Sequence, residues 1–256
     1  MGDDPGSDFS RLARQSGVIT DPAAGEVLDL PHGTTCIALR FDDGVLIAGD
    51  RRATSGHLIS YRTMQKVFPS DRHSAVAIAG AAGAAIEMVR LFQLQLEHYE
   101  KVEGKELSLD GKAAQLSQML RQNLPAARAG MVVVTLFAGY DLRTNVGRLF
   151  QFDISGGRYE ELEYGSTGSG SLHASTVLKL GFRAGMDRDT AVDLAIQALY
   201  VAADEDSASG LPDFVRNLFP VVSTVTDKGY EQVDDDEIRE RSQRLVDELT
   251  SRNSTI

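Results

Sequence analysis

The sequence has few of the residues that cross-link a chain or bind nucleic acid. It contains no tryptophan and a single cysteine, Cys36, so no disulfide can form within the chain and a reducing compartment is expected. Basic residues are also scarce, because 26 Lys and Arg stand against 37 Asp and Glu, for a net charge of -11. This charge opposes binding to a nucleic-acid backbone or an anionic membrane surface, and we expect neither partner.

Long apolar runs and clustered metal ligands are missing as well. No stretch approaches the roughly 20 apolar residues of a membrane span, and the N-terminus lacks the basic-then-apolar order of a secretion signal. The five histidines are scattered, which argues against a transition-metal site. We therefore expect a cytoplasmic protein with no metal and no cofactor.

The first 33 residues differ in composition from the rest. They are mostly acidic and small, with short apolar patches only at 9–12 and 27–30, and they can bury too little apolar surface to offset the entropy of ordering. A mobile leader is expected. The remaining chain, in a sequence of 256 residues that is 42% hydrophobic, is long enough for one large domain or two small ones.

After the leader, runs of predicted strands alternate with runs of predicted helices. A hairpin is expected around Asp42-Asp43-Gly44, because glycine tolerates the positive φ of a tight turn. Segregated runs of this kind predict an α+β layered domain with mainly antiparallel sheets rather than alternating βαβ units. Strands are expected at 35–41, 45–50, 58–60, 66–69, 74–79, 131–140, 148–153, 158–164, 219–226 and 230–233, and helices at 81–102, 108–124, 171–182, 189–203 and 234–251.

Two glycine-rich segments resemble phosphate-binding loops only superficially. The segment Ile78–Gly83 lies between a predicted strand and a predicted helix, but it has no Gly-x-Gly and no parallel unit around it. The segment Gly165–Ser171 lacks the lysine of a phosphate loop. We interpret it as a tight strand-to-helix turn whose hydroxyls can hydrogen-bond to nearby groups.

Three charged motifs have ordinary explanations when each is taken alone. Gly49-Asp50-Arg51-Arg52 would be a charged turn, and Lys66 would be a solvent-facing lysine on a strand. Asp206-Ser207-Ala208-Ser209-Gly210 would be the C-terminal turn of a helix. None of the three is specific, and only their order along the chain carries information.

That order resembles the β subunit of the 20S proteasome in its actinobacterial form. Gly-Thr-Thr opens a strand at 33–35, Gly-Asp-Arg-Arg ends its hairpin partner, and a lysine follows in the next strand segment. An Ala-Gly at a strand-to-helix turn, a Gly-Ser-Gly-Ser and an Asp-x-x-Ser-Gly after a helix come later, so the resemblance runs from Gly33 to about Val233. It implies an α+β fold, the four-layer αββα sandwich of the N-terminal nucleophile hydrolases.

The resemblance also implies that the chain is a precursor of a threonine protease. Cleavage of the Gly33–Thr34 bond would remove residues 1–33 as a propeptide and leave 34–256 as the catalytic domain, with Thr34 as nucleophile. The chemistry is coherent, because a threonine hydroxyl is a poor nucleophile until a base takes its proton. A free α-amine with a pKa of about 7.7–8.0 can do so near neutral pH, whereas an amide nitrogen cannot.

The same resemblance assigns roles around Thr34. Lys66 would favour the deprotonated hydroxyl, Asp50 would hold Lys66, and the backbone N–H of Gly80 would donate to the oxyanion. None of the substrate-binding positions is charged, which predicts cleavage after apolar residues. The supporting network around the amine is Ser169, Asp206 and Ser209, and the substrate-binding positions are Ala53, Thr54, Met64, Ile78 and Ala82.

The partners implied by the family are α subunits and further β subunits. Two seven-membered β rings would lie between two seven-membered α rings, with a ring-shaped ATPase as activator and unfolded proteins as substrates. One alternative is the hexameric-ring, ATP-dependent threonine protease, which also begins Thr-Thr but is shorter and usually lacks the Arg51-Arg52 pair. The other is a non-catalytic ring or assembly subunit, although Gly33, Thr34 and Lys66 are all retained.

Overall fold

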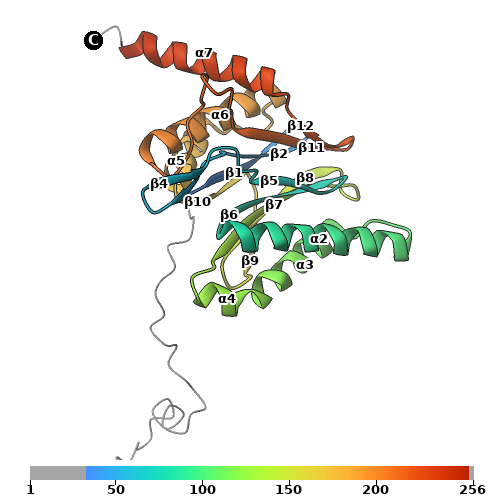
Figure 1. Ribbon diagram of the computed structural model, residues 1–256. Helices are drawn as coiled ribbons and strands as arrows, with labels where there is room; N and C mark the ends of the chain where they lie inside the picture. The colour runs from blue at the N-terminus through green and yellow to red at the C-terminus, as the bar shows by residue number, and fades with distance from the viewer. Residues whose placement is uncertain (1–32, 254–256) are drawn as a thin grey trace, which may run out of the picture.

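Two five-stranded antiparallel sheets face each other in the computed structural model, which describes residues 33–253 (Figure 1). Their strand orders are β10-β1-β2-β11-β12 and β5-β6-β7-β8-β9. Helices α5 and α6 cover the first sheet, with α7 packed on α6, and helices α2 and α3 cover the second. This four-layer arrangement confirms the predicted α+β fold. The predicted leader, up to residue 32, lies outside the described residues.

The strands follow the predicted order, with β3 as an addition that pairs with the strand predicted at 58–60. Strands β3 and β4 form a separate two-stranded sheet next to the end of β2. The strands are β1 (Thr35–Phe41), β2 (Gly44–Gly49), β3 (Ala53–Ser55), β4 (Leu58–Tyr61), β5 (Val67–Asp71), β6 (Ser74–Gly80), β7 (Val133–Asp141), β8 (Val146–Phe152), β9 (Arg158–Glu161), β10 (Tyr164–Gly168), β11 (Val221–Thr226) and β12 (Gly229–Gln232).

The helices also follow the prediction, except at one proline. The helix predicted at 108–124 ends at Gln122, and Pro125 lies in the first turn of a short helix of its own, where a missing N–H costs no hydrogen bond. The helices are α2 (Ala82–Glu103), α3 (Leu109–Gln122), α4 (Leu124–Arg128), α5 (Ser171–Gly181), α6 (Arg188–Glu205) and α7 (Asp235–Asn253).

The predicted hairpin of β1 and β2 is confirmed, but for a different reason at its glycine. Phe41 pairs with Gly44 across the two-residue turn. Gly44 does not have a positive φ. Instead, a Cβ at Gly44 would lie 2.2 Å from the carbonyl oxygen of Val225 on the neighbouring strand β11. Close approach of two strands, rather than turn geometry, requires glycine at this position.

The predicted strand at 158–164 is in fact parts of two strands in different sheets. Strand β9 pairs with β8 in the second sheet, whereas β10 pairs with β1 in the first. The segment Gly165–Ser171 was interpreted as a tight turn, but Gly165–Gly168 belongs to β10 and only Ser169 and Gly170 connect it to α5. The backbone of β10 is satisfied by pairing with β1, a long-range contact that the local sequence does not indicate.

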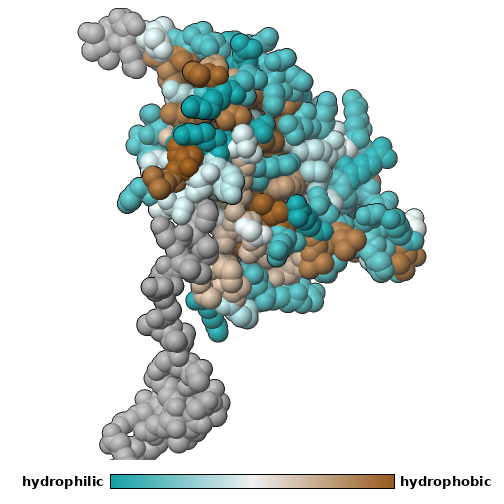
Figure 2. All heavy atoms as spheres, in the orientation of Figure 1, coloured by the Kyte–Doolittle hydropathy of each residue, from teal (hydrophilic) through white to brown (hydrophobic). Residues whose placement is uncertain are grey.

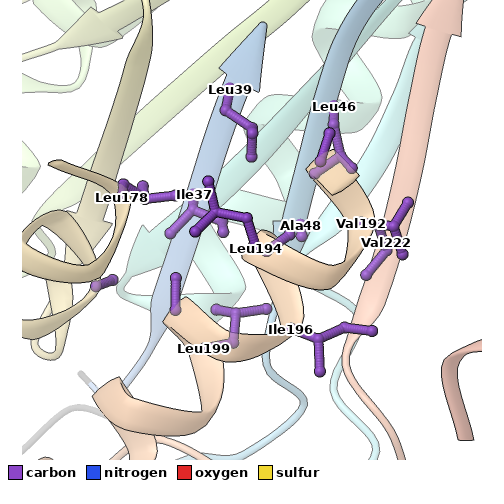
Figure 3. Packing of buried hydrophobic residues seen from close by; sticks show 14 of the residues in the cluster. Ile37, Leu39, Leu46, Ala48, Leu178, Val192, Leu194, Ile196, Leu199 and Val222 are labelled. Atoms are coloured by element: carbon purple, nitrogen blue, oxygen red, sulfur yellow. The ribbon is translucent and has the colours of Figure 1, made fainter. Parts of the chain in front are cut away.

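The side chains of β1 alternate between two hydrophobic layers, as a strand with two buried faces requires. Ile37 and Leu39 point toward α6, where they pack with Leu194 and Leu199 (Figure 3). Cys36, two residues from Thr34, faces the second sheet instead. The strand that follows the candidate nucleophile is therefore fixed on both faces.

Apolar side chains are exposed on α2 and on β4, among other places on the surface. On α2, Leu94 is 60% exposed and Val102 is 65% exposed, and Figure 2 shows apolar residues among the polar ones along this helix. On β4, Leu58 is 76% exposed. Within residues 33–253, no helix is long and apolar enough to cross a membrane.

Candidate active site

Thr34 lies directly before β1, with its hydroxyl against the carbonyl of the preceding residue. Its peptide bond to Gly33 is intact, its side chain is buried, and its Oγ1 donates a hydrogen bond to the Gly33 carbonyl oxygen at 2.5 Å. Its backbone N–H donates to Ser169 Oγ at 3.2 Å. The candidate nucleophile and the bond predicted to be cleaved are therefore in direct contact.

Gly33 fits its position because it has no side chain. A Cβ at this residue would lie 2.5 Å from Thr54 Oγ1, and also 2.5 Å from Cβ and the carbonyl oxygen of Ala208. These atoms come from β3 and from the loop after α6, two segments far apart in the chain. A larger residue could not enter this gap without moving backbone, so the packing itself requires glycine before Thr34.

Lys66 is buried beside the same carbonyl, just before β5. Its side chain is 1% exposed, so the interpretation of a solvent-facing lysine is wrong. Its Nζ donates to Asp50 Oδ1 at 2.7 Å, to the Gly33 carbonyl oxygen at 3.2 Å and to the carbonyl oxygen of Arg52. Three acceptors match the three N–H groups of an ammonium, which offsets part of the cost of burying its charge.

Asp50 follows the last residue of β2 and links three segments through its carboxylate. Oδ1 accepts from Lys66 Nζ and, at 2.9 Å, from the backbone N–H of Thr35. Oδ2 accepts from the backbone N–H groups of Arg52 at 2.9 Å and Gly210 at 2.8 Å. With four donors around it, the carboxylate is held rigidly, and it in turn fixes the position of the Lys66 ammonium.

Three further polar residues form a network that reaches the Thr34 nitrogen through Ser169. Ser169 Oγ donates to Asp206 Oδ2 at 2.5 Å, and Ser209 Oγ donates to the same oxygen at 2.8 Å. Asp206 is the C-terminal cap of α6, so the ordinary interpretation of this motif as a helix end is also confirmed. The structure thus brings together all six side chains predicted as catalytic, which come from β1, β2, β5, β10 and α6 or their ends.

Gly80 ends β6 immediately before α2, in a conformation that glycine favours. Its φ is +98°, and a Cβ here would lie 2.2 Å from the carbonyl oxygen of Val132. The next residue, Ala81, donates its N–H to the same oxygen at 2.7 Å. Residue 80 therefore has to be glycine. The role of the Gly80 N–H as oxyanion donor stays a prediction.

The predicted substrate-binding residues lie on segments attached to this centre. The backbone N–H of Ile78 donates to the Lys66 carbonyl at 2.9 Å, and that of Met64 to the Arg51 carbonyl at 3.0 Å. Ala53 and Thr54 are both buried on β3, and Ile78 is 2% exposed within the cluster under α2. Ala82 begins α2 and is half-buried. Their grouping into one pocket stays a prediction.

Cys36 is the only thiol and lies close to the charged pair. Its Sγ points to the Ile78 carbonyl oxygen at 3.5 Å, and it is completely buried. Burial raises the pKa of the Cys36 thiol to about 12, although the positive charge of Lys66 acts in the opposite direction. A thiol in this state is a poor nucleophile. Among the described residues, no group of three His, Cys, Asp or Glu side chains could hold a metal ion.

Two participants in the network were not identified from the sequence. The Arg52 carbonyl accepts from Lys66, and the Thr35 hydroxyl lies 2.6 Å from Ser209 Oγ. A backbone carbonyl leaves no signal in the residue type. Thr35 carried a weak signal, since it is a second hydroxyl residue directly after the candidate nucleophile, but it was interpreted as an ordinary strand residue.

Comparisons with known proteins identify the family. Residues 30–212 match the family model described as "Proteasome subunit". A protein of Acidimicrobium ferrooxidans described as "Proteasome subunit beta" is 55% identical over 254 residues, which cover 98% of this chain and 93% of the relative. A protein of Streptomyces griseus with the same description is 52% identical over 226 residues, which cover 88% of this chain and 80% of the relative.

Proposed function

The chain belongs to the proteasome subunit family, with β subunits of actinobacteria among its relatives, and on that premise we propose that it is a catalytic β subunit. In this proposal Thr34 becomes an N-terminal nucleophile that hydrolyses peptide bonds of unfolded proteins. Residues 1–33 are a propeptide, and residues 34–256 form the catalytic domain. The protein works in the cytoplasm, and no cofactor takes part.

The observation that carries the proposal is the arrangement of two groups around one carbonyl. Thr34 Oγ1 lies 2.5 Å from the Gly33 oxygen, and Lys66 Nζ lies 3.2 Å from the same oxygen. A hydroxyl next to the carbonyl can attack its carbon, and a buried ammonium at the oxygen favours the negative charge that develops during attack. These two contacts support an acyl transfer at this bond.

The proposed self-cleavage has two steps. First, Thr34 Oγ1 loses its proton and bonds to the Gly33 carbonyl carbon, the C–N bond breaks, and the Thr34 nitrogen takes up a proton, leaving an ester between the two residues. Second, water attacks the ester carbonyl, which releases residues 1–33 with a carboxylate and restores the Thr34 hydroxyl. The nitrogen is now a free amine.

The free amine provides the base that the uncleaved chain lacks. Near neutral pH it can accept the Thr34 hydroxyl proton while the oxygen attacks a substrate carbonyl, and later give that proton to the leaving amine. Lys66 favours the neutral amine and the deprotonated hydroxyl through its charge. Ser169 is placed to accept an N–H of the amine, as it accepts the amide N–H before cleavage.

Substrate preference and assembly follow the same family pattern in this proposal. The uncharged positions Ala53, Met64 and Ile78 favour apolar side chains before the cleaved bond, because a charged one would lose its water without gaining a partner. The exposed apolar residues on α2 and β4 suit a subunit whose surface is covered by neighbours. Those neighbours are α subunits and other β subunits, arranged in stacked seven-membered rings that receive substrates from a ring-shaped ATPase.

Mass analysis tests this proposal directly. The chain is assembled with an α subunit of its family, and the intact mass of the β subunit and hydrolysis of an apolar fluorogenic peptide are measured. We expect a β subunit that begins at Thr34. With Thr34→Ala we expect the full-length mass, intact particles and no hydrolysis. A leader that stays attached in assembled particles, or residual hydrolysis by Thr34→Ala, would contradict the assignment.

A further inference from the structure

The Thr35 hydroxyl is buried next to the candidate catalytic network. Thr35 is 0% exposed, and its Oγ1 lies 2.6 Å from Ser209 Oγ. Its backbone N–H is already committed to Asp50 Oδ1 at 2.9 Å. Thr35 therefore contacts both halves of the site, the charged pair through its backbone and the serine pair through its side chain.

Counting protons settles the direction of the bond between Thr35 and Ser209. Each hydroxyl has one proton to donate. Ser209 Oγ lies 2.8 Å from Asp206 Oδ2, and an ionised carboxylate can only accept, so the Ser209 proton points to Asp206. The proton between Thr35 and Ser209 must then come from Thr35. Thr35 donates to the Ser209 oxygen, so the Ser209 proton stays available for the bond to Asp206.

The chain of hydrogen bonds continues from Asp206 through Ser169 to Thr34. Ser169 donates its proton to Asp206 Oδ2 at 2.5 Å, which leaves Ser169 Oγ to accept the N–H of Thr34 at 3.2 Å. One carboxylate oxygen thus orients both serines. The Thr35 hydroxyl holds Ser209 from its acceptor side, and Asp206 connects Ser209 to Ser169, which accepts the Thr34 N–H.

The packing at Gly170 independently indicates that space is kept for the Thr35 hydroxyl. A Cβ at Gly170 would lie 2.3 Å from Thr35 Oγ1 and 3.2 Å from Ser209 Oγ. Its φ of -86° is one that any residue adopts, so backbone conformation does not require glycine there. The space at Gly170 is needed by the Thr35 hydroxyl.

We propose that Thr35 is a positioning residue for Thr34, acting through its hydroxyl on Ser209, Asp206 and Ser169. The proposal rests on the proposed function, in which the Thr34 nitrogen is the base. Without the Thr35 hydroxyl, the Ser209 oxygen loses the hydrogen bond that it accepts. Ser209 can then rotate its own proton away from Asp206. The Thr34 nitrogen then loses a fixed orientation, so turnover slows while substrate binding does not change.

The test compares Thr35→Val, which keeps the shape and removes the hydroxyl, with Thr35→Ser, which keeps the hydroxyl. Both are measured as processed, assembled particles with an apolar fluorogenic peptide. We expect Thr35→Val to lower kcat about ten-fold, the equivalent of one lost hydrogen bond, with KM within about two-fold of the unsubstituted protein. Thr35→Ser should restore kcat to within about two-fold.

Thr135→Val is the matched control. Thr135 is equally buried, but its Oγ1 has no hydrogen-bond partner within the part of the chain that the structure describes, so the same chemical change removes no bond. Its kcat should not change. If Thr35→Val does not assemble, Gly170→Ala decides, because its methyl group displaces the Thr35 hydroxyl and should lower kcat in the same way.

Three results would overturn the proposal: an unchanged kcat in Thr35→Val or, where that variant does not assemble, in Gly170→Ala; an equal fall in Thr135→Val; or no rescue by Thr35→Ser. Failure of the proposed function itself looks different. In that case the unsubstituted particles would not hydrolyse the peptide, or Thr34→Ala would hydrolyse it equally well. The role of Thr35 would then be rejected together with the proposed function.

Discussion

Lys66 and Asp50 form an ion pair of 2.7 Å whose two side chains are 1% and 0% exposed. A pair buried this deeply contributes little net stability, because removing two charges from water costs about as much as their attraction returns. Removing one partner is costly, since the other charge then stays buried alone. The presence of the pair is better explained by its position, because the Lys66 ammonium contacts the Gly33 carbonyl beside Thr34.

Lys66→Met is expected to stop both leader removal and peptide hydrolysis. The substitution removes the charge that favours the oxyanion and the deprotonated hydroxyl, and it leaves the Asp50 carboxylate without its cation. The free energy of unfolding should fall by about 3 kcal/mol. Intact mass, peptide hydrolysis and thermal unfolding measure the three effects.

Lys112→Met is the control for this substitution. Lys112 is 2% exposed and pairs with Asp71 at 2.6 Å and Glu106 at 3.0 Å, and neither carboxylate belongs to the Thr34 network. Its loss should destabilise the fold by a similar amount, about 3 kcal/mol, while assembled particles remove the leader and hydrolyse peptide normally. If Lys66→Met removed its leader as completely as Lys112→Met, the assigned role of Lys66 would be wrong.

Gly80→Ala should lower the free energy of unfolding by more than a strained φ alone would. It should also lower peptide hydrolysis. Gly130 is the matched control, because its φ is +94° and nothing lies within 4 Å of the position of its Cβ. Gly130→Ala should cost about 1 kcal/mol and leave activity unchanged. Gly80→Ala adds the contact with the Val132 oxygen, which must move. Equal unfolding temperatures and equal activities for the two variants would contradict this expectation.

The Cys36 thiol should resist alkylation in the folded protein. Burial raises its pKa to about 12, so almost no thiolate exists at pH 8, and reagents cannot reach the sulfur. Treatment of assembled particles with iodoacetamide at pH 8 should leave both mass and peptide hydrolysis unchanged, and one alkyl group should add after denaturation. Rapid labelling of the native particles with loss of activity would instead indicate a cysteine-dependent enzyme.

Glu106 should contribute stability that disappears in acid. Burial acts to raise the pKa of Glu106, but hydrogen bonds and charges from Lys112 and His73 outweigh it and hold the pKa below its usual value. A carboxyl with a lowered folded-state pKa stabilises the fold above its unfolded pKa of about 4.3, and this stability is lost as the pH falls through the folded value.

The variant Glu106→Gln isolates that contribution. At pH 7 its free energy of unfolding should be lower by about 1 kcal/mol, a modest value because the carboxyl is partly exposed. The difference should shrink toward zero as the pH falls below about 4. A difference that is equal at pH 7 and at pH 3 would show that the charge of Glu106 does not matter. Urea titrations at the two pH values make the comparison.

The sequence predicted most of the fold because local patterns decide most of it. The β-branched and apolar run at 35–41 marked β1, and the long amphipathic repeat marked α2. Prediction from the sequence was wrong where pairing between distant segments decides the structure. Gly165–Gly168 is glycine-rich like a loop, yet β1 offers it a partner strand, and this contact is invisible in the local composition.

The candidate site was predicted residue by residue only through the resemblance to a family. Taken alone, the residues suggested that Lys66 faces solvent, because nothing near it in the sequence reveals Asp50 and two carbonyls around its ammonium. Backbone groups such as the Arg52 carbonyl have no sequence signature at all. The hydroxyl of Thr35 was visible in the sequence but had no partner until α6 brought Ser209 beside it.

The bond from the Gly210 N–H to Asp50 joins two residues that are 160 positions apart. Asp50 is made early in synthesis and Gly210 late, so a chain that has not been synthesised and folded through its last third lacks one of the donors that hold this carboxylate. In the proposed function, self-cleavage is therefore linked to completion of the fold. On that basis we expect a nascent or misfolded chain to keep its leader and only completed subunits to become active.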